Sequence, residues 1–133
     1  MDIVDETLHQ WRSTSFVYGQ SDCMLSIGRY LARTGHKDVT SRFIGRYDDH
    51  EGAQQIMADH GGVEGLMELA GAEPHYGTPD RGDVVEVVYV EDGDRMGVGG
   101  LCTGGMVAVR LERGVIEVRL GMVEIGGVWH GRR

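Results

Sequence analysis

The hydrophobic period of the chain changes once, near Pro74 and Pro79. Before these prolines, apolar residues recur every three or four positions, as on one face of an α-helix. After them, β-branched residues form short runs that are continuous or alternate with polar residues, as in β-strands. A chain whose helices come first and whose strands come second belongs to the α+β class. We therefore expect helices over about residues 1–73, packed on an antiparallel sheet formed by about residues 80–130.

Four amphipathic helices are expected in the first part. Capping residues and glycines mark their ends, because short polar side chains satisfy the first backbone N–H groups and glycine readily adopts the left-handed conformation that stops a helix. The first expected helix covers residues 2–12, and the second runs from Cys23 to Thr34, with a cap at Ser21 or Asp22 and a stop at Gly35. The third begins after a cap at Asp48 or Asp49 and ends at Gly61-Gly62. The fourth runs from Val63 to Ala70 and ends before Gly71.

Four strands are expected in the second part: Asp83–Val90, Met96–Thr103, Met106–Leu111 and Val115–Leu120. The first is nearly continuous in apolar residues, which predicts burial on both faces. Alternation in the last predicts one core face, with Ile116, Val118 and Leu120, and one face toward water. Asp92-Gly93 is a strong hairpin signal. Trp129 is expected to pin the C-terminal segment onto the sheet.

Length and composition limit the function classes. The chain has 133 residues, and we expect residues 1–133 to form a single domain with a core of its own. A net charge of −8 argues against nucleic-acid binding and is compatible with a basic protein partner. Two distant cysteines do not form a disulfide framework, which favours reduced thiols and assembly in a cytoplasm. No apolar run is long enough for a membrane span, and the acidic N-terminus is unlike a signal peptide.

The stretch with the clearest chemical potential is Phe16-Val17-Tyr18-Gly19-Gln20-Ser21-Asp22-Cys23. It predicts a tight loop that places Cys23 at a helix N-terminus, where unpaired N–H groups and the helix dipole favour a thiolate. A cysteine nucleophile could be built there, although a lone cysteine at such a position is more often a small buried hydrophobe. Catalysis would further need a base, usually histidine, and a third group to orient it.

This stretch resembles the nucleophile loop of NlpC-type, papain-like peptidoglycan peptidases, which cut between amino acids of cell-wall peptides. The whole chain more closely resembles small phage and gene-transfer-agent tail proteins related to that superfamily. The resemblance implies a papain-like (NlpC-type) fold and a place at the tip of a long-tailed particle. The matching pieces are Gly45-Arg46-Tyr47, the helix start Glu51-Gly52-Ala53, residues 60–66, Arg81-Gly82-Asp83-Val84-Val85 and a tryptophan close to the C-terminus.

The chain departs from the active family pattern at the base. Family members carry a histidine in a Gly-His-Val-Gly-like segment, whereas residues 96–102 here contain none and place Val98 or Gly99 at that position. The Cys-Ser-Gly that usually starts the family's helix is Cys23-Met24-Leu25. Because general-base help contributes roughly 10²–10⁴-fold to rate, the sequence predicts a slow or dead enzyme unless another histidine supplies the base.

Two of the six histidines, His75 and His130, are the candidates for a substitute base. The other four are expected at solvated positions or, for His60, at a helix C-terminus. Their spacing matches no zinc signature and neither cysteine has a Cys-x-x-Cys partner, so neither a metal nor a cofactor is expected. If the resemblance holds, alternation along the strand points Cys102 toward the Cys23 helix, so a thiol pair is conceivable but a buried thiol is favoured.

The sequence therefore predicts a structural and assembly component of a phage or phage-like tail tip, with a degenerate cell-wall peptidase fold. Cys23, Tyr18 and Asp22 are the expected remnants of the catalytic site. The expected partners are the hub, the large tip protein and peptidoglycan, in a virion assembled in the bacterial host cytoplasm. The first alternative is an active cysteine peptidase that opens peptidoglycan as the genome enters, with Cys23 as nucleophile and Tyr18 as oxyanion helper. The second is a free cytoplasmic peptide-binding module.

Overall fold

The computed structural model describes residues 1–132 and has an α+β architecture. Within these residues, four α-helices precede a five-stranded antiparallel sheet, which confirms the predicted fold class and the order of the elements. The elements are α1 (Ile3–Ser13), α2 (Cys23–Arg33), the 3-10 helix η1 (Thr40–Arg42), α3 (His50–Asp59), α4 (Gly62–Ala70), β1 (Val84–Glu91), β2 (Asp94–Cys102), β3 (Met106–Leu111), β4 (Gly114–Arg119), the 3-10 helix η2 (Leu120–Met122) and β5 (Glu124–Trp129).

Aspartate side chains start three of the helices. Asp2, Asp22 and Asp49 each accept a hydrogen bond from a backbone N–H group in the first turn of α1, α2 and α3. This satisfies a donor that has no partner within the helix. Ser21 and Asp48, the alternative caps, do not have this role. The predicted stops are also confirmed, since Gly35 and Gly71 both have positive φ angles, of 98° and 74°.

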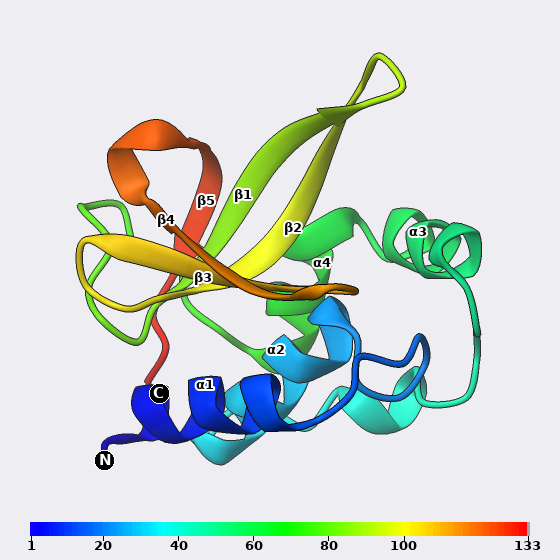
Figure 1. Ribbon diagram of the computed structural model, residues 1–133, viewed down its shortest axis with the longest axis horizontal. Helices are drawn as coiled ribbons and strands as arrows, with labels where there is room; N and C mark the ends of the chain where they lie inside the picture. Colours follow the sequence, from blue (N-terminus) through cyan, green and yellow to red (C-terminus); the bar gives the residue numbers. More distant parts are fainter. Residues whose placement is uncertain (133) are drawn as a thin grey trace.

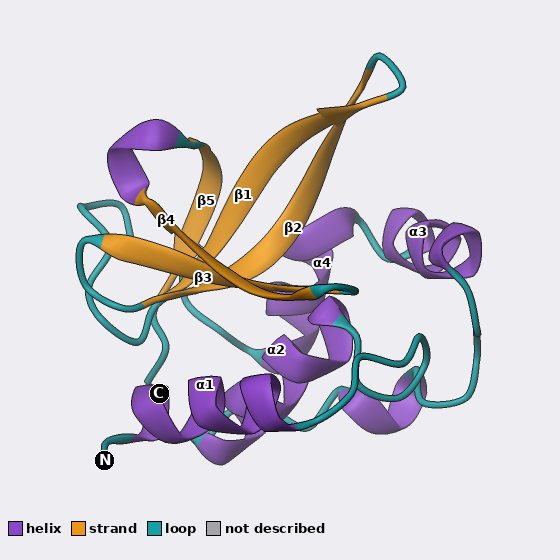
Figure 2. Ribbon diagram, viewed as in Figure 1, coloured by secondary structure: helices purple, strands orange, loops and turns teal. Residues whose placement is uncertain are grey.

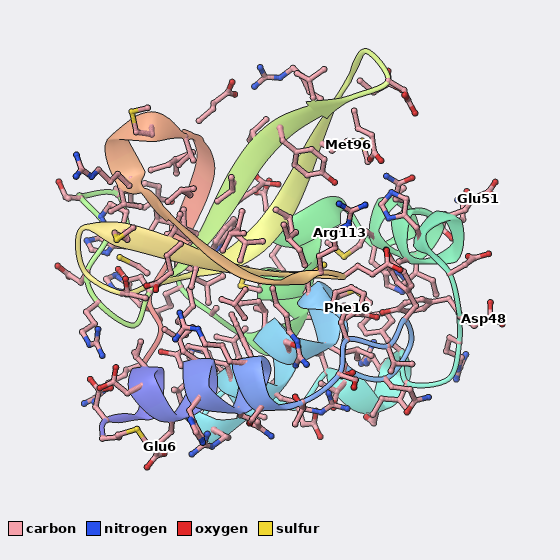
Figure 3. The ribbon with its side chains drawn as sticks, in the orientation of Figure 1. Glu6, Phe16, Asp48, Glu51, Met96 and Arg113 are labelled. Atoms are coloured by element: carbon pink, nitrogen blue, oxygen red, sulfur yellow. The ribbon has the colours of Figure 1, made fainter. Side chains whose placement is uncertain are left out.

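The helices cover one face of the sheet, whose strand order is β4-β3-β2-β1-β5 (Figures 1 and 2). Val84, Leu101 and Ala108 point from the three central strands into a core shared with the helices. Across this interface α2 packs on β2: a Cβ atom added to Gly99 would lie 3.3 Å from Cγ1 of Ile27. The thiol-bearing helix therefore rests on the glycine-rich strand. Acidic side chains such as Glu6, Asp48 and Glu51 lie on the outside of the helical layer (Figure 3).

The opposite face of the sheet has a smaller core of its own. The three-residue η2 connects β4 and β5, which form opposite edges of the sheet. So short a link requires the two edges to approach each other, and the sheet curls accordingly (Figure 1). The residues enclosed by the curl are Val85, Val87, Cys102, Val107 and Val109, with Val98, Val118, Leu120, Val123 and Val128 around them.

The β1–β2 hairpin departs from the expected burial. Its turn is as predicted, with positive φ angles of 50° at Asp92 and 84° at Gly93. Burial on both faces, however, holds only for the first half of β1: Val84 and Val85 are fully buried, whereas Val90 is 68% exposed. The hairpin extends beyond the helices, so its outer half has no layer to pack on (Figure 1).

Two further departures concern the edges of the sheet. Ile116, expected in the core, is 45% exposed because β4 is an edge strand, although Val118 and Leu120 do contact the second core. The C-terminal segment is a full strand, β5, that pairs with β1. Trp129 is buried in the main core and lies opposite Val84, which confirms that it holds this segment on the sheet.

Candidate functional site

Cys23 is the first residue of α2 and follows a turn that begins at Val17. Gly19 makes this turn possible, because it has a φ of 79° and because a Cβ atom there would lie 2.0 Å from the carbonyl oxygen of Tyr47. The loop and the thiol are therefore arranged as the sequence predicts. The side chain of Cys23 is half-buried, and its thiol is free.

Asp22 holds the loop together. Its Oδ1 atom accepts from the N–H group of Leu25 at 3.0 Å, which caps α2. Its Oδ2 atom accepts from the N–H group of Gly19 at 2.8 Å and from the hydroxyl group of Tyr47 at 2.5 Å. The side chain is 1% exposed. With both oxygen atoms engaged, Asp22 has a structural role in the loop and does not orient a base.

The environment of Cys23 opposes formation of a thiolate. Burial first and the negative charge of Asp22 second raise the pKa of Cys23 to about 12, while nearby backbone N–H groups lower it only partly. The backbone N–H groups at the start of α2 act in the expected direction, because they lower the pKa of the thiol, but the net shift is upward. Desolvation and an adjacent carboxylate outweigh the effect of the helix terminus.

No histidine assists the thiol. Among residues 1–132, no hydrogen bond joins an imidazole to the sulfur of Cys23. Val98 and Gly99, which the resemblance to the peptidases aligns with the missing base, point in different directions: Gly99 faces Ile27 on α2, while Val98 packs in the second core on the other face of the sheet. Neither residue can accept a proton, so the predicted loss of the base is complete at this place.

Beside the loop, three polar side chains form a hydrogen-bonded chain that sequence reasoning missed. The hydroxyl group of Tyr18 lies 3.3 Å from Nδ1 of His50, and Nε2 of His50 lies 3.1 Å from Oε1 of Glu91. Tyr18 lies in the same loop, five residues before Cys23. Burial raises the pKa of Tyr18, and the charge of Glu112 raises it further. Both imidazole nitrogens of His50 are thus engaged, and neither contacts the sulfur of Cys23.

Arg110 connects this region to the sheet. It lies on β3, is 4% exposed, and donates to Oγ of Ser26, to the carbonyl oxygen and Oγ1 of Thr14, and to the carbonyl oxygen of Ser15. These bonds attach the segment between α1 and α2 to the centre of the fold. Burial lowers the pKa of Arg110, and the nearby charge of Arg29 lowers it further.

A family model matches residues 2–130, which is almost the whole chain, and this match decides the family. The chain belongs to the DUF6950 family. This family is described as a domain of unknown function. No curated protein and no solved structure matches the chain.

In this DUF6950 domain the two histidines predicted as substitute bases lie far from the thiol. His75 and His130 stack on each other with ring centroids 4.4 Å apart, and Nδ1 of His75 lies 2.7 Å from Oδ2 of Asp83. The carbonyl group of Gly82, next to Asp83, accepts from the hydroxyl group of Tyr30. Tyr30 lies seven residues after Cys23 on α2, about 10 Å along the helix axis. The histidines therefore form a separate cluster and cannot serve Cys23.

Cys102 is also placed differently from the prediction. It is fully buried in the second core, on the face of the sheet that points away from α2. Leu101 and Gly99, not Cys102, face the helices. A thiol pair between Cys23 and Cys102 is therefore excluded in this fold, and both cysteines are free.

The sequence reveals the loop, its cap and the missing base, but not the contacts between distant segments. No spacing rule connects His50 to Glu91 or His75 to His130, because the fold alone brings these residues together. As for membranes, no helix within residues 1–132 combines the length and the apolar character that a membrane span requires.

Proposed function

We propose that this domain is a catalytically silent relative of the cell-wall cysteine peptidases and acts as an assembly component of a phage or phage-like tail tip. The observation that carries the proposal is the environment of Cys23: no imidazole among residues 1–132 bonds to its sulfur, and burial raises the pKa of the thiol. The loop places a cysteine at a helix N-terminus, but that cysteine lacks the proton acceptor that a nucleophile needs.

The weak ionisation of the Cys23 thiol favours an inactive site. Because burial raises the pKa of the Cys23 thiol, it is ionised at pH 7 to far less than the few per cent of an ordinary cysteine. General-base catalysis, worth roughly 10²–10⁴-fold, would be absent as well. The loop that carries Cys23 would then bind a peptide or a glycan rather than cut it.

The surface of the sheet supports a role in assembly. Large apolar side chains project from its periphery: Val90 on the hairpin is 68% exposed, Met122 on η2 is 80% exposed, and Tyr76 before β1 is 95% exposed. Such residues contribute to protein–protein contacts when a partner covers them. The hub and the large tip protein are the partners that we propose, and the tail tip is the location.

Two assays on the full-length chain test this function. Purified particles should contain the chain in a fixed copy number, as measured by quantitative mass spectrometry. The purified protein should release no peptides from peptidoglycan, and Cys23→Ala should not change that result; an active cell-wall peptidase serves as the positive control. Absence from particles would refute the assembly role. Peptide release that disappears with Cys23→Ala would refute the inactive site.

The second candidate is the active peptidase, and one observation favours it. Tyr18, His50 and Glu91 form a hydrogen-bonded chain of the kind that orients a base, and Tyr18 lies in the same loop as Cys23. If substrate binding brought Tyr18 or His50 within hydrogen-bonding distance of the sulfur, the chain could accept its proton. In that case His50→Ala would abolish peptide release as completely as Cys23→Ala, whereas His9→Ala, an exposed control on α1, would leave it unchanged.

A further inference from the structure

A cluster of potential ligand side chains lies at the end of α2 remote from Cys23. His75 precedes β1, Asp83 immediately precedes its first residue, and His130 follows β5. Each offers one nitrogen or oxygen atom, and these atoms lie within 4.8 Å of one another. Asp83 is 5% exposed, and the side chain of His75 is 17% exposed. The cluster thus joins the segment before β1 to the distant residue His130, and it is largely shielded from water.

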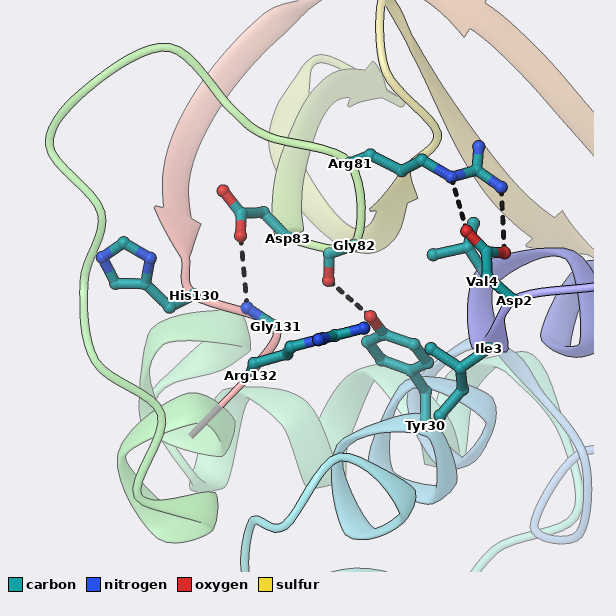
Figure 4. A pocket seen from close by; sticks show the side chains of 10 residues that line it. All are labelled: Asp2, Ile3, Val4, Tyr30, Arg81, Gly82, Asp83, His130, Gly131 and Arg132. Atoms are coloured by element: carbon teal, nitrogen blue, oxygen red, sulfur yellow. Dashed lines mark hydrogen bonds and ion pairs between the residues drawn. The ribbon is translucent and has the colours of Figure 1, made fainter.

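Backbone hydrogen bonds fix the positions of all three residues. The N–H group of His75 donates to the carbonyl oxygen of Val128, and that of His130 donates to the carbonyl oxygen of Glu73. The Asp83 carboxylate accepts from the N–H groups of Asp80 at 2.9 Å and Gly131 at 3.2 Å (Figure 4). Ligands of metal ions are commonly held in this way by a surrounding shell of hydrogen bonds.

Gly131 adds a steric constraint to this arrangement. A Cβ atom at Gly131 would lie 1.6 Å from the carbonyl oxygen of Gly82, so only glycine allows the two segments to pass so closely. The close approach brings His130 beside Asp83. It also leaves a cavity of about 250 Å³, lined by both residues and by Tyr30, Arg81 and Arg132 (Figure 4).

We propose that His75, Asp83 and His130 bind one divalent transition-metal ion of the zinc type, with a fourth coordination position open to this cavity. Two imidazoles and one carboxylate are a ligand set that zinc and related ions accept. A neutral imidazole has one ring nitrogen whose lone pair can bind a metal ion. Of the two arginines that line the cavity, Arg81 is paired with Asp2 and Asp5.

Metal binding requires a local rearrangement. Bonds of about 2.0–2.2 Å in a tetrahedral site place ligand atoms about 3.3 Å apart. The His75–Asp83 hydrogen bond of 2.7 Å must therefore open slightly, and the stacked ring of His130 must turn toward the ion. His130 is half-buried, so its ring is not enclosed on every side.

The test uses the full-length chain without a histidine tag. Titration with Co²⁺, followed by competition with Zn²⁺, should give one ion per chain with the visible spectrum of a four-coordinate site. His75→Gln and His130→Gln should each weaken binding at least tenfold. His9→Gln, which removes an exposed imidazole on α1, should bind as the wild type does. Affinity equal in all four proteins, or no saturable binding at all, would overturn the proposal.

A second measurement needs no substitution and so does not depend on the folding of a variant. In the wild-type protein, stoichiometric Zn²⁺ should shift the imidazole ¹⁵N resonances of His75 and His130 and leave that of His9 in place. Shifts confined to other histidines would refute the site. The outcome does not depend on the state of Cys23, so this proposal and the proposed function can fail separately.

Discussion

At the scale of single residues, Asp22 determines both the shape of the loop and the acidity of Cys23. It caps α2, binds Gly19 and Tyr47, and its charge raises the pKa of the neighbouring thiol. The cap could be predicted from the sequence, because aspartate before a helical stripe is a local signal. The bond to Tyr47 could not, because the two residues are brought together only by the fold.

Asp22→Asn should separate these two effects. The amide keeps an oxygen atom that can cap α2, but its NH₂ group cannot accept from Gly19 and Tyr47. We expect a loss of about 1–3 kcal/mol in the free energy of unfolding, measured by urea denaturation. The pKa of Cys23 should fall, because the charge that raises it is gone. Asp48→Asn, at an exposed position that caps no helix, is the control and should change neither quantity.

At the scale of elements, the order and kind of helices and strands could be predicted well, because apolar period, caps and turn residues are local signals. The predictions of burial fail where the neighbours of an element decide whether it is covered. The outer half of β1 and Ile116 on β4 are apolar yet exposed, since a projecting hairpin and an edge strand lack a covering layer. The direction of Cys102 was missed for a similar reason: strand alternation gives two faces but not which one meets the helices.

Arg110 provides a test of how β3 holds the segment before α2. Arg110→Met keeps much of the side-chain volume but leaves the carbonyl groups of Thr14 and Ser15 without their donor. We expect the free energy of unfolding to drop by about 2–4 kcal/mol, because buried acceptors lose hydrogen bonds to a charged group. Arg113→Met, in the exposed turn between β3 and β4, should cost less than about 0.5 kcal/mol. Equal losses in the two variants would show that Arg110 does not anchor the segment.

At the scale of the whole molecule, stability should depend on pH in the alkaline range. Burial raises the pKa of Cys23 to about 12 and, together with the hydrogen bond to Asp22, also raises the pKa of Tyr47. The folded protein therefore retains protons that the unfolded chain loses above about pH 8.5 for cysteine and about pH 10 for tyrosine. Because the folded state binds more protons in this window, stability falls as pH rises through it toward about 12.

Denaturant unfolding from pH 8 to pH 12 measures this dependence. Tyr47→Phe removes one of the two groups and should reduce the decline above about pH 10. Tyr76→Phe, which changes a tyrosine that is 95% exposed, should leave the decline as in the wild type. Stability that stays constant over this range would contradict the assigned environments of Cys23 and Tyr47.

The ionisation of Cys23 tests the central claim most directly. In a Cys102→Ala background Cys23 is the only thiol of the chain, and its alkylation by iodoacetamide can be followed as a function of pH. We predict slow labelling at neutral pH and a midpoint near pH 12, well above the value of about 8.5 for a free cysteine. A midpoint below 8.5 would contradict the claim and would mean that Cys23 is an activated nucleophile.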